Sequence, residues 1–311
     1  MPDRASPREP AGAARADLTS RLAAAGLDPA AAARLVRAAL AEDLAGGTDV
    51  TTRATIAPAA LGDAHLVARA AGVVAGLPVA EAVFAAASGP AADSRPVVVR
   101  YLAADGDAVL AGQVLATVHG RVRAILTAER TALNLLCHLS GVATLTRRWV
   151  DAVAGTRAQI RDTRKTLPGL RALQKYAVRC GGGVNHRMSL ADAALIKDNH
   201  VAAAGSVSAA FAAVTGQAAG IPVEVECDTL AQVAEALAAG AELILLDNFA
   251  IGAMAEAVGL AAGRARLEAS GGLTLATARE AAQTGVDYLA VGALTHSAPA
   301  LDIGLDLVPA R

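Results

Sequence analysis

Short apolar runs alternate with Ala- and Leu-rich stretches along the second half of the chain. The runs predict β-strands at 159–162, 194–197, 223–226, 243–247, 266–270 and 288–292. Four of these strands close on Glu226, Asp247, Ser270 and Gly292, at intervals of 21, 23 and 22 residues. A strand-helix unit that repeats at this spacing predicts a parallel sheet, built either as a barrel or as a doubly wound sheet.

The way the strands end favours the barrel. Each ends in a polar residue or glycine, which is typical of α/β-barrels because their chemistry lies at the carboxyl ends of the strands. Six strong strands indicate an incomplete barrel, and an eight-stranded barrel is the alternative count. The predicted fold class is therefore α/β, an incomplete α/β-barrel with an N-terminal α+β sandwich domain.

The first half of the chain has a different pattern. Residues 18–45 predict two helices, the second capped by Asp28 with Pro29 at its first position. Residues 64–119 contain short β-type runs, with a turn at 105–107 between two strands, and 127–154 predict a long helix. We therefore expect a disordered tail at 1–17, a sandwich domain at 18–130, the barrel at 131–295, and a C-terminal tail at 296–311 that packs on the sandwich domain.

Composition excludes several classes of protein. No apolar run of 18 residues is free of charge, so no membrane span is expected. A pI near 6.6 and 2% aromatic residues give no nucleic-acid footprint. The first 17 residues contain no apolar signal region, and the three cysteines have no metal-ligand spacing. We expect a soluble, cytoplasmic protein without disulfides or structural zinc.

Positive charge is concentrated in residues 161–200. Eight Lys or Arg against three acidic residues give this stretch a charge of +5 in a chain of net charge −1, which suits a pocket for a small, highly anionic ligand. The chain has 25 Arg but only three Lys, all in this stretch. Lys165 and Lys197 are therefore candidates for gripping phosphate oxygens or a leaving group. We assign Arg171, Lys175 and Arg179 to a solvated face of a helix at 169–180.

The predicted strand ends carry a second group of candidates. Glu226 and Asp247 occupy equivalent positions on successive strands, so both carboxylates would face one opening and could hold Mg²⁺ on a pyrophosphate. The alternative is that each caps a following helix. The loops after the last two strands, Ser270-Gly271-Gly272 and Val291-Gly292-Ala293, are small enough for backbone N–H groups to bind phosphate.

Several strings of the chain resemble the quinolinate phosphoribosyltransferases. They are AERTALN (128–134), SGVATLT (140–146), RDTRKTLPGLR (161–171), GGGVNHR (181–187), LIKDNH (195–200), EVE (224–226), LLDN (245–248), ASGG (269–272) and VGALTHS (291–297). One departure is Thr48, where the family more often has an uninterrupted GD-T. The resemblance implies an α/β-barrel with an N-terminal sandwich domain, in homodimers with shared sites; assembly into hexamers is left open. It also implies the joining of quinolinate to 5-phosphoribosyl 1-pyrophosphate, giving nicotinate mononucleotide, pyrophosphate and CO₂ in the synthesis of NAD.

The resemblance also implies roles for single residues. Quinolinate would be bound by Arg130, Arg164, His186, Arg187 and Lys197. The phosphoribosyl donor would be held by Thr163, Lys165 and the two glycine-containing loops, Ser270-Gly271-Gly272 and Val291-Gly292-Ala293. Glu226 and Asp247 would hold Mg²⁺, directly or through water or substrate, and the ribose hydroxyls. A purely structural role for His186 is the alternative, and His138 and His296 are interpreted as structural.

Two other functions are alternatives to this one. A related phosphoribosyltransferase-like protein with a different acceptor, such as nicotinate, would not need the second carboxylate clamp that the three arginines suggest. A non-enzymatic anion-binding or carrier module is suggested by residues 96–120, which resemble the hammerhead of biotinyl and lipoyl domains. No Lys precedes residue 165 to be modified, and a carrier would leave the rim carboxylates unexplained.

Overall fold

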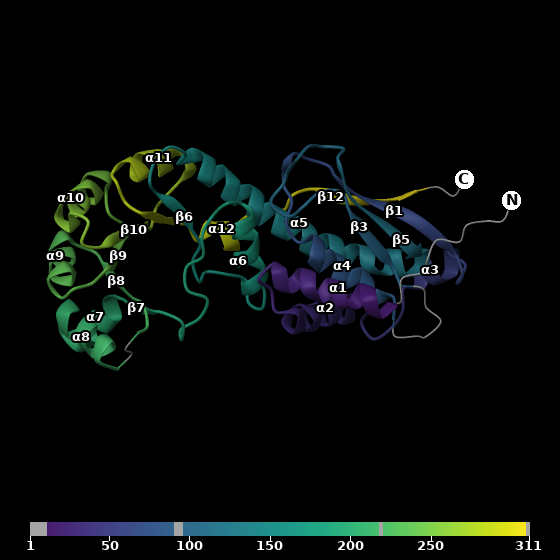
Figure 1. The fold of residues 1–311 in the computed structure, drawn as a ribbon, viewed down its shortest axis with the longest axis horizontal. Coiled ribbons are helices and arrows are strands. Elements are labelled where there is room, and N and C mark those ends of the chain that lie inside the picture. Colours follow the sequence, from purple (N-terminus) through teal and green to yellow (C-terminus); the bar gives the residue numbers. More distant parts are fainter. Residues whose placement is uncertain (1–10, 90–95, 218–219, 309–311) are drawn as a thin grey trace. The chain divides into compact units, whose positions relative to one another are not determined.

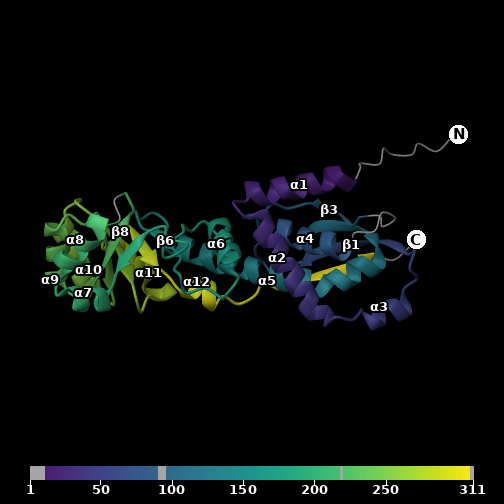
Figure 2. The ribbon, with the colours of Figure 1, turned by 90° about the horizontal axis from the view of Figure 1, so that it is seen from below.

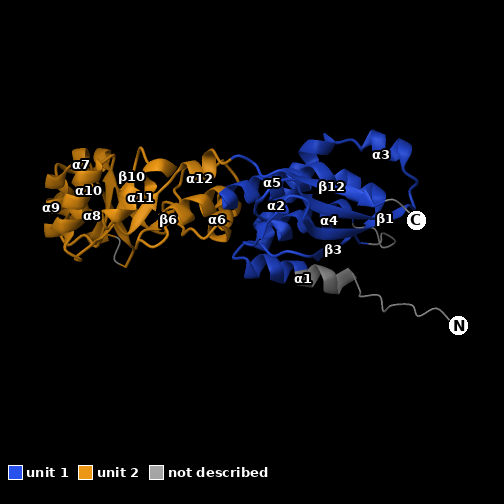
Figure 3. Cartoon of the chain, turned by 90° about the horizontal axis from the view of Figure 1, so that it is seen from above, with its two compact units in different colours: residues 1–144, 299–311 blue, residues 145–298 orange. Residues whose placement is uncertain are grey.

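The computed structural model describes residues 11–89, 96–217 and 220–308, with side chains from residue 18 onward. The chain forms two compact units (Figure 3). Unit 1 comprises 1–144 and 299–311, and unit 2 comprises 145–298. The first boundary, after Thr144, falls inside the long helix α5 (Val122–Ala152), whereas the boundary predicted from the sequence lies after residue 130 of the same helix. Of the predicted tail at 1–17, residues 1–10 lie outside the described residues, and residues 11–17 belong to a helix, α1 (Ala11–Ala24).

Unit 2 is built on a six-stranded sheet in which every neighbouring pair is parallel. Its strands are β6 (Gln159–Arg161), β7 (Ala194–Ile196), β8 (Val223–Cys227), β9 (Leu243–Asp247), β10 (Arg266–Ser270) and β11 (Tyr288–Ala290). Its helices are α6 (Arg171–Cys180), α7 (Asp198–Ala204), α8 (Val207–Gln217), α9 (Leu230–Ala238), α10 (Ile251–Ala261), α11 (Leu275–Gln283) and α12 (Ala293–His296). Figure 1 shows α9, α10 and α11 around the outer side of the strands. All six predicted strands are present.

The order of the strands distinguishes a barrel arrangement from a doubly wound sheet. The order is β6-β11-β10-β9-β8-β7, so successive strands from β7 to β11 are neighbours and the first strand, β6, lies beside the last, β11. A doubly wound sheet would instead extend in both directions from its first strand. Val184 forms a parallel bridge with Arg161 of β6, and the chain leads from there to β7 at the opposite edge. Residues 184–194 therefore connect the two edge strands of the sheet.

Contacts across the sheet reveal how strongly it curves. Arg161 of β6 and Glu224 of β8 are four places apart in the strand order, yet their side chains are 3.9 Å apart. Four strand spacings of about 4.8 Å would separate them by roughly 19 Å in a flat sheet. These side chains therefore share the concave face, while Val225, on the opposite face of β8, is completely buried.

Unit 1 contains an antiparallel sheet of order β12-β1-β5-β3. Its strands are β1 (Leu61–Ala68), β3 (Val98–Tyr101), β5 (Val114–Arg121) and β12 (Ile303–Val308), and β2 (Gly72–Val73) pairs separately with β4 (Ala108–Val109). The helices are α1 (Ala11–Ala24), α2 (Pro29–Leu44), α3 (Val50–Thr55), α4 (Leu77–Ala87) and most of α5 (Val122–Ala152). Figure 2 shows α1, α2 and α4 grouped beside this sheet. The N-terminal sheet domain and the parallel sheet together confirm the predicted fold class.

Local details of unit 1 confirm two predictions, the cap at Asp28 and the turn at 105–107. Asp28 accepts from Ala30 N and caps α2, with Pro29 at the first helical position. The predicted turn at 105–107 lies between β3 and β4, which pair with β5 and β2 and not with each other. Within this turn, Asp105 accepts hydrogen bonds from the backbone N–H groups of Gly76 and Leu77, and so caps α4.

The C-terminal strand reaches its place by crossing α5 closely. Leu301 N donates to the carbonyl of Cys137, and a Cβ at Gly141 would overlap the backbone of Pro299. Only glycine allows this approach, after which β12 pairs along the whole of its length with β1.

The described helices include none that is long and apolar enough to cross a membrane.

Candidate functional site

The carboxyl ends of the parallel strands bring several predicted site residues to one edge of unit 2. Lys197 follows β7, Glu226 lies near the end of β8, Asp247 and Ser270 end β9 and β10, and Gly292 follows β11. Lys197 Nζ donates to Glu226 Oε2. The positions predicted as a rim therefore form one.

The helix-cap alternative is wrong for both rim carboxylates. The N-cap of α9 is Thr229, whose hydroxyl accepts from Gln232 N, and the N-cap of α10 is Ala250. Asp247 instead accepts a 2.8 Å hydrogen bond from the Asn248 side chain. Neither carboxylate therefore caps a helix. Both side chains are partly exposed at the edge, where their oxygens could serve as metal ligands.

The glycine-containing loops are closely packed. Gly271 has a φ of +84°, and a Cβ there would overlap the Asn248 side chain. A Cβ at Gly292 would lie 3.0 Å from Lys165 Cδ and 3.3 Å from His296 Nε2, so Lys165 and His296 flank this loop. Thr163 Oγ1 accepts from Lys165 N at 3.0 Å. The absence of a side chain at Gly271 and Gly292 thus allows polar side chains such as Asn248 and Lys165 to approach the backbone closely.

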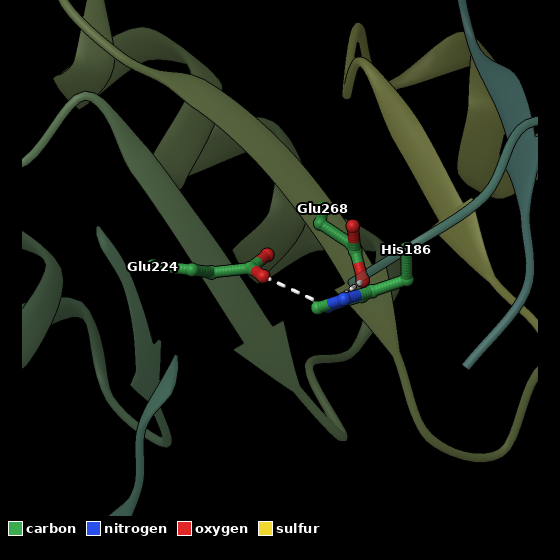
Figure 4. A group of neighbouring side chains, drawn as sticks. All are labelled: His186, Glu224 and Glu268. Atoms are coloured by element: carbon green, nitrogen blue, oxygen red, sulfur yellow. Dashed lines mark ion pairs between the residues drawn. The ribbon is translucent and has the colours of Figure 1, made fainter. Parts of the chain in front are cut away.

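A layer of buried charge occupies the concave face beneath the rim. It consists of Arg161, His186, Glu224 and Glu268; His186 is 8% exposed, Glu224 3% and Glu268 0%. His186 Nε2 lies 2.8 Å from Glu224 and 3.7 Å from Glu268 (Figure 4), while Arg161 pairs with Glu268. Burial, followed by the charge of Glu224, raises the pKa of Glu268 to about 8.

This layer resembles a metal site but lacks the right protonation. His186, Glu224 and Glu268 offer ligand atoms within 4.8 Å of one another. However, His186 Nδ1 accepts from Arg187 N at 2.7 Å, so the ring proton is on Nε2, the atom that would have to bind the metal. The Arg161 guanidinium already supplies a cation to both carboxylates. We therefore interpret the layer as an ion-pair cluster.

A cavity of about 280 Å³ extends from this layer. Its walls include Arg161, His186, Arg187 and Glu224, together with Ala194 and Leu243, the first residues of β7 and β9. Burial, followed by the charge of Arg164, lowers the pKa of Arg187. Among the described residues, the buried Nε atoms of Arg164 and Arg187 have no hydrogen-bond partner. Two close guanidinium groups with unused donors are suited to an anionic ligand.

A second buried cluster fixes the loop that carries His186 and Arg187. Asp162, directly after β6, accepts from Lys175 Nζ, from His186 N at 2.8 Å and from Asn185 Nδ2 at 2.6 Å. Lys175 Nζ also donates to the His186 carbonyl at 2.8 Å. Lys175 is completely buried, so its assignment to a solvated helix face is wrong. Of the three residues assigned to the solvated face, Arg179 is exposed and Arg171 is half-buried.

The predicted site residues are divided between the two units. Thr163, Arg164, Lys165, His186, Arg187, Lys197, Glu226, Asp247 and the two glycine-containing loops all belong to unit 2, whereas Arg130 is an exposed residue of α5 in unit 1.

Sequence reasoning missed Arg161, Asp162, Lys175, Glu224 and Glu268. A signal for Glu224 and Glu268 was present: each lies two positions before a predicted rim residue, so strand alternation places it on the same face.

Comparison with known proteins gives a consistent result. Two family models match, described as the N-terminal and C-terminal domains of quinolinate phosphoribosyl transferase, over residues 49–140 and 142–306. The nicotinate-nucleotide pyrophosphorylase (carboxylating) of Mycobacterium leprae is 55% identical over 280 residues, covering 89% of this chain and 97% of that protein. Quinolinate phosphoribosyltransferase (decarboxylating) 1 of Nicotiana glauca is 41% identical over 292 residues, covering 88% and 81%. The solved structure of the nicotinate-nucleotide pyrophosphorylase from Francisella tularensis superimposes with a TM-score of 0.83 at 37% identity, covering 89% of this chain and 96% of that one.

Proposed function

The chain belongs to the quinolinate phosphoribosyltransferase family, and on that premise we propose how its residues carry out the reaction of the family. The enzyme transfers the phosphoribosyl group of 5-phosphoribosyl 1-pyrophosphate to quinolinate with loss of CO₂, forming nicotinate mononucleotide and pyrophosphate in de novo NAD biosynthesis. It is a decarboxylating pentosyltransferase.

Arg164 and Arg187 are the proposed ligands of the pyridine dicarboxylate. The observation that carries this proposal is the pair of buried guanidinium Nε atoms without a partner in the described chain. Burial, followed by the positive charge of Arg164, lowers the pKa of Arg187, and two substrate carboxylates would offset the repulsion between the two guanidinium groups. Bidentate contacts between guanidinium and carboxylate supply both affinity and orientation. Lys197, at the adjacent strand end, contributes a further cation.

The phosphoribosyl donor is proposed to lie along the rim. Lys165 is suited to the leaving pyrophosphate because its side chain packs beside Gly292. The backbone N–H groups of Ser270-Gly271-Gly272 and Val291-Gly292-Ala293 would bind the 5-phosphate, and Thr163 would support Lys165 through the hydrogen bond between them. This arrangement orients the anomeric carbon toward the acceptor.

Glu226 and Asp247 fit a role in holding Mg²⁺. Both are hard oxygen donors at one edge, and each already has one oxygen engaged by a neighbouring side chain. Such carboxylates suit Mg²⁺, which keeps several waters and is often bound through one or two carboxylates and substrate phosphates. When bound, the ion would neutralise charge on the departing pyrophosphate.

The chemistry then proceeds without a general base on the protein. As the bond to pyrophosphate breaks, charge builds on the leaving group, and Lys165 and Lys197 stabilise it. The anomeric carbon becomes oxocarbenium-like, and the pyridine nitrogen attacks it with its lone pair. The resulting cationic ring accepts the electron pair released when the adjacent carboxylate leaves as CO₂, and the ring carbon then takes a proton from a general acid or water. Arg164 and Arg187 hold the ring in line throughout.

We further propose that the enzyme works in the cytoplasm as a homodimer in which Arg130 completes the acceptor site of the partner subunit. Mixing inactive Arg130→Ala and inactive Lys197→Ala subunits should restore activity, because one site of each mixed dimer receives both intact residues. Failure to restore activity after demonstrated subunit exchange would contradict this arrangement.

The proposed function is tested by measuring CO₂ release from carboxyl-labelled quinolinate. Release should require 5-phosphoribosyl 1-pyrophosphate and Mg²⁺, and should produce equal amounts of nicotinate mononucleotide. Replacement of quinolinate by nicotinate is the control for the alternative acceptor. Nucleotide formed equally well from nicotinate would contradict the dicarboxylate site.

A further inference from the structure

Both ring nitrogens of His186 are occupied by groups of the protein itself. Nδ1 accepts the backbone N–H of Arg187 at 2.7 Å, and Nε2 faces Glu224 Oε2 at 2.8 Å. A nitrogen that accepts an N–H bond carries no proton, so Nε2 must carry the ring proton. The ring is therefore neutral, in the Nε2–H form, and its single donor is directed at Glu224.

The backbone of His186 is equally committed. Its N–H donates to Asp162 Oδ1 at 2.8 Å and its carbonyl accepts from Lys175 Nζ at 2.8 Å. The residue is 8% exposed. A substrate carboxylate needs a donor, and His186 has none left to offer without breaking the bond to a buried glutamate.

The bond from Arg187 N to the ring has a consequence for the neighbouring residue. It fixes the backbone from which the Arg187 side chain extends, while Arg187 Nη1 donates to the Ala193 carbonyl at 2.8 Å and fixes the other end of the side chain. The Arg187 Nε atom is then left buried without a partner among the described residues. His186 thus orients a cation that does have an unused donor.

We propose that His186 and Glu224 are positioning residues for Arg187, and that the His186 ring makes no direct contact with the pyridine dicarboxylate. This inference rests on the proposed function, because it divides roles within the same acceptor site. Glu224 fixes the ring tautomer through Nε2–H, the ring fixes the Arg187 backbone, and Arg187 contacts the substrate.

The tautomer can be measured directly. Heteronuclear NMR of histidine-labelled protein, with the signal assigned by its loss in His186→Asn, should show one protonated and one unprotonated ring nitrogen. Addition of quinolinate should leave both unchanged. A ring that is doubly protonated, or that changes its protonated nitrogen when quinolinate binds, overturns the proposal.

A double-mutant cycle tests the indirect action of His186 on binding. His186→Asn should weaken quinolinate binding at least tenfold in the wild-type background, yet add less than about twofold in an Arg187→Met background, because a positioning residue has nothing left to position. An equal loss in both backgrounds would identify His186 as an independent ligand and overturn the proposal.

Glu224 offers a matched conservative pair. Glu224→Gln keeps an oxygen that accepts from Nε2–H and should retain quinolinate affinity within about threefold, whereas Glu224→Leu removes the acceptor and should behave like His186→Asn. Equal losses in Gln and Leu would mean that the carboxylate charge, and not the tautomer, matters. The NMR measurement on the ligand-free protein stands even if quinolinate proves not to be the acceptor, so the two proposals fail separately.

Discussion

Removing the Lys175 ammonium should destabilise unit 2 far more than removing a neighbouring exposed cation. Lys175→Met leaves Asp162 buried with two hydrogen bonds, from His186 N and Asn185 Nδ2, but without its ion-pair partner. Breaking one side of a buried pair costs about 3–5 kcal/mol, a large part of a total stability of about 5–15 kcal/mol. Arg179→Met, four residues along the same helix, removes an exposed hydrogen bond to Asn185 and should cost about 1 kcal/mol.

The direction of the pH effect follows from the carboxyl that is left behind. Burial already raises the pKa of Asp162 and lowers that of Lys175, since both charges are disfavoured in the interior. Without Lys175 the folded-state pKa of Asp162 rises further above its unfolded value. The folded variant then binds a proton that the unfolded chain does not, so its stability falls as pH rises. The difference from wild type should be smaller near about pH 5 than near about pH 8.

Trp149 provides the measurement. It is the only tryptophan in the chain, is 4% exposed, and belongs to unit 2, so its fluorescence during urea unfolding reports on this unit. Losses of equal size for Lys175→Met and Arg179→Met, or a Lys175→Met loss that does not change with pH, would refute the reasoning. Lys175→Arg should also be destabilising, by about 1–3 kcal/mol, because a larger head group must fit a fully buried position.

Three further predictions concern the rim and the layer beneath it. Lys165→Arg and Lys197→Arg should each lower turnover more than about tenfold, although both substitutions conserve the charge. The reason is that a guanidinium cannot replace a compact ammonium beside Gly292 or Glu226. A wild-type kcat in either variant would contradict this prediction. The ratio of kcat/KM for quinolinate to that for nicotinate should be about 10²–10³, from about 3–5 kcal/mol for a buried guanidinium left unpaired; comparable values would contradict the dicarboxylate clamp. The pKa of Glu268 is raised to about 8, so folding takes up a proton at this carboxyl. The stability of unit 2 should therefore fall as pH rises from about 4.5 toward about 8. Glu268→Gln should remove this dependence on pH in urea unfolding followed by Trp149 fluorescence.

The sequence was most informative where chemistry follows a local period. The six strands of unit 2 follow from short apolar runs, and the rim follows from the polar residue or glycine that closes each predicted strand. Glu226 and Asp247 could be placed at one edge because parallel strands end together.

Contacts that depend on curvature could not be read in this way. Arg161 meets Glu224 only because the sheet bends through four strand spacings, and no local pattern encodes that distance. Lys175 shows a second limit. Its spacing from Arg171 and Arg179 is that of one helix face, but this spacing does not show that the face packs against a buried carboxylate, Asp162. The protonation of His186 depends on a backbone N–H whose direction is set by the folded loop.

The pairing of β12 with β1 has a consequence for synthesis on the ribosome. All of unit 2, residues 145–298, is translated before the segment that completes the sheet of unit 1. Unit 2 is continuous, so none of its residues is made after residue 298. The earlier-made unit 1 must wait with the edge of β1 uncovered until residues 303–308 arrive. The sheet of unit 1, whose first strand is made early, is therefore expected to be completed only after all of unit 2 has been synthesised, in contrast to the usual N-terminal-first sequence of events.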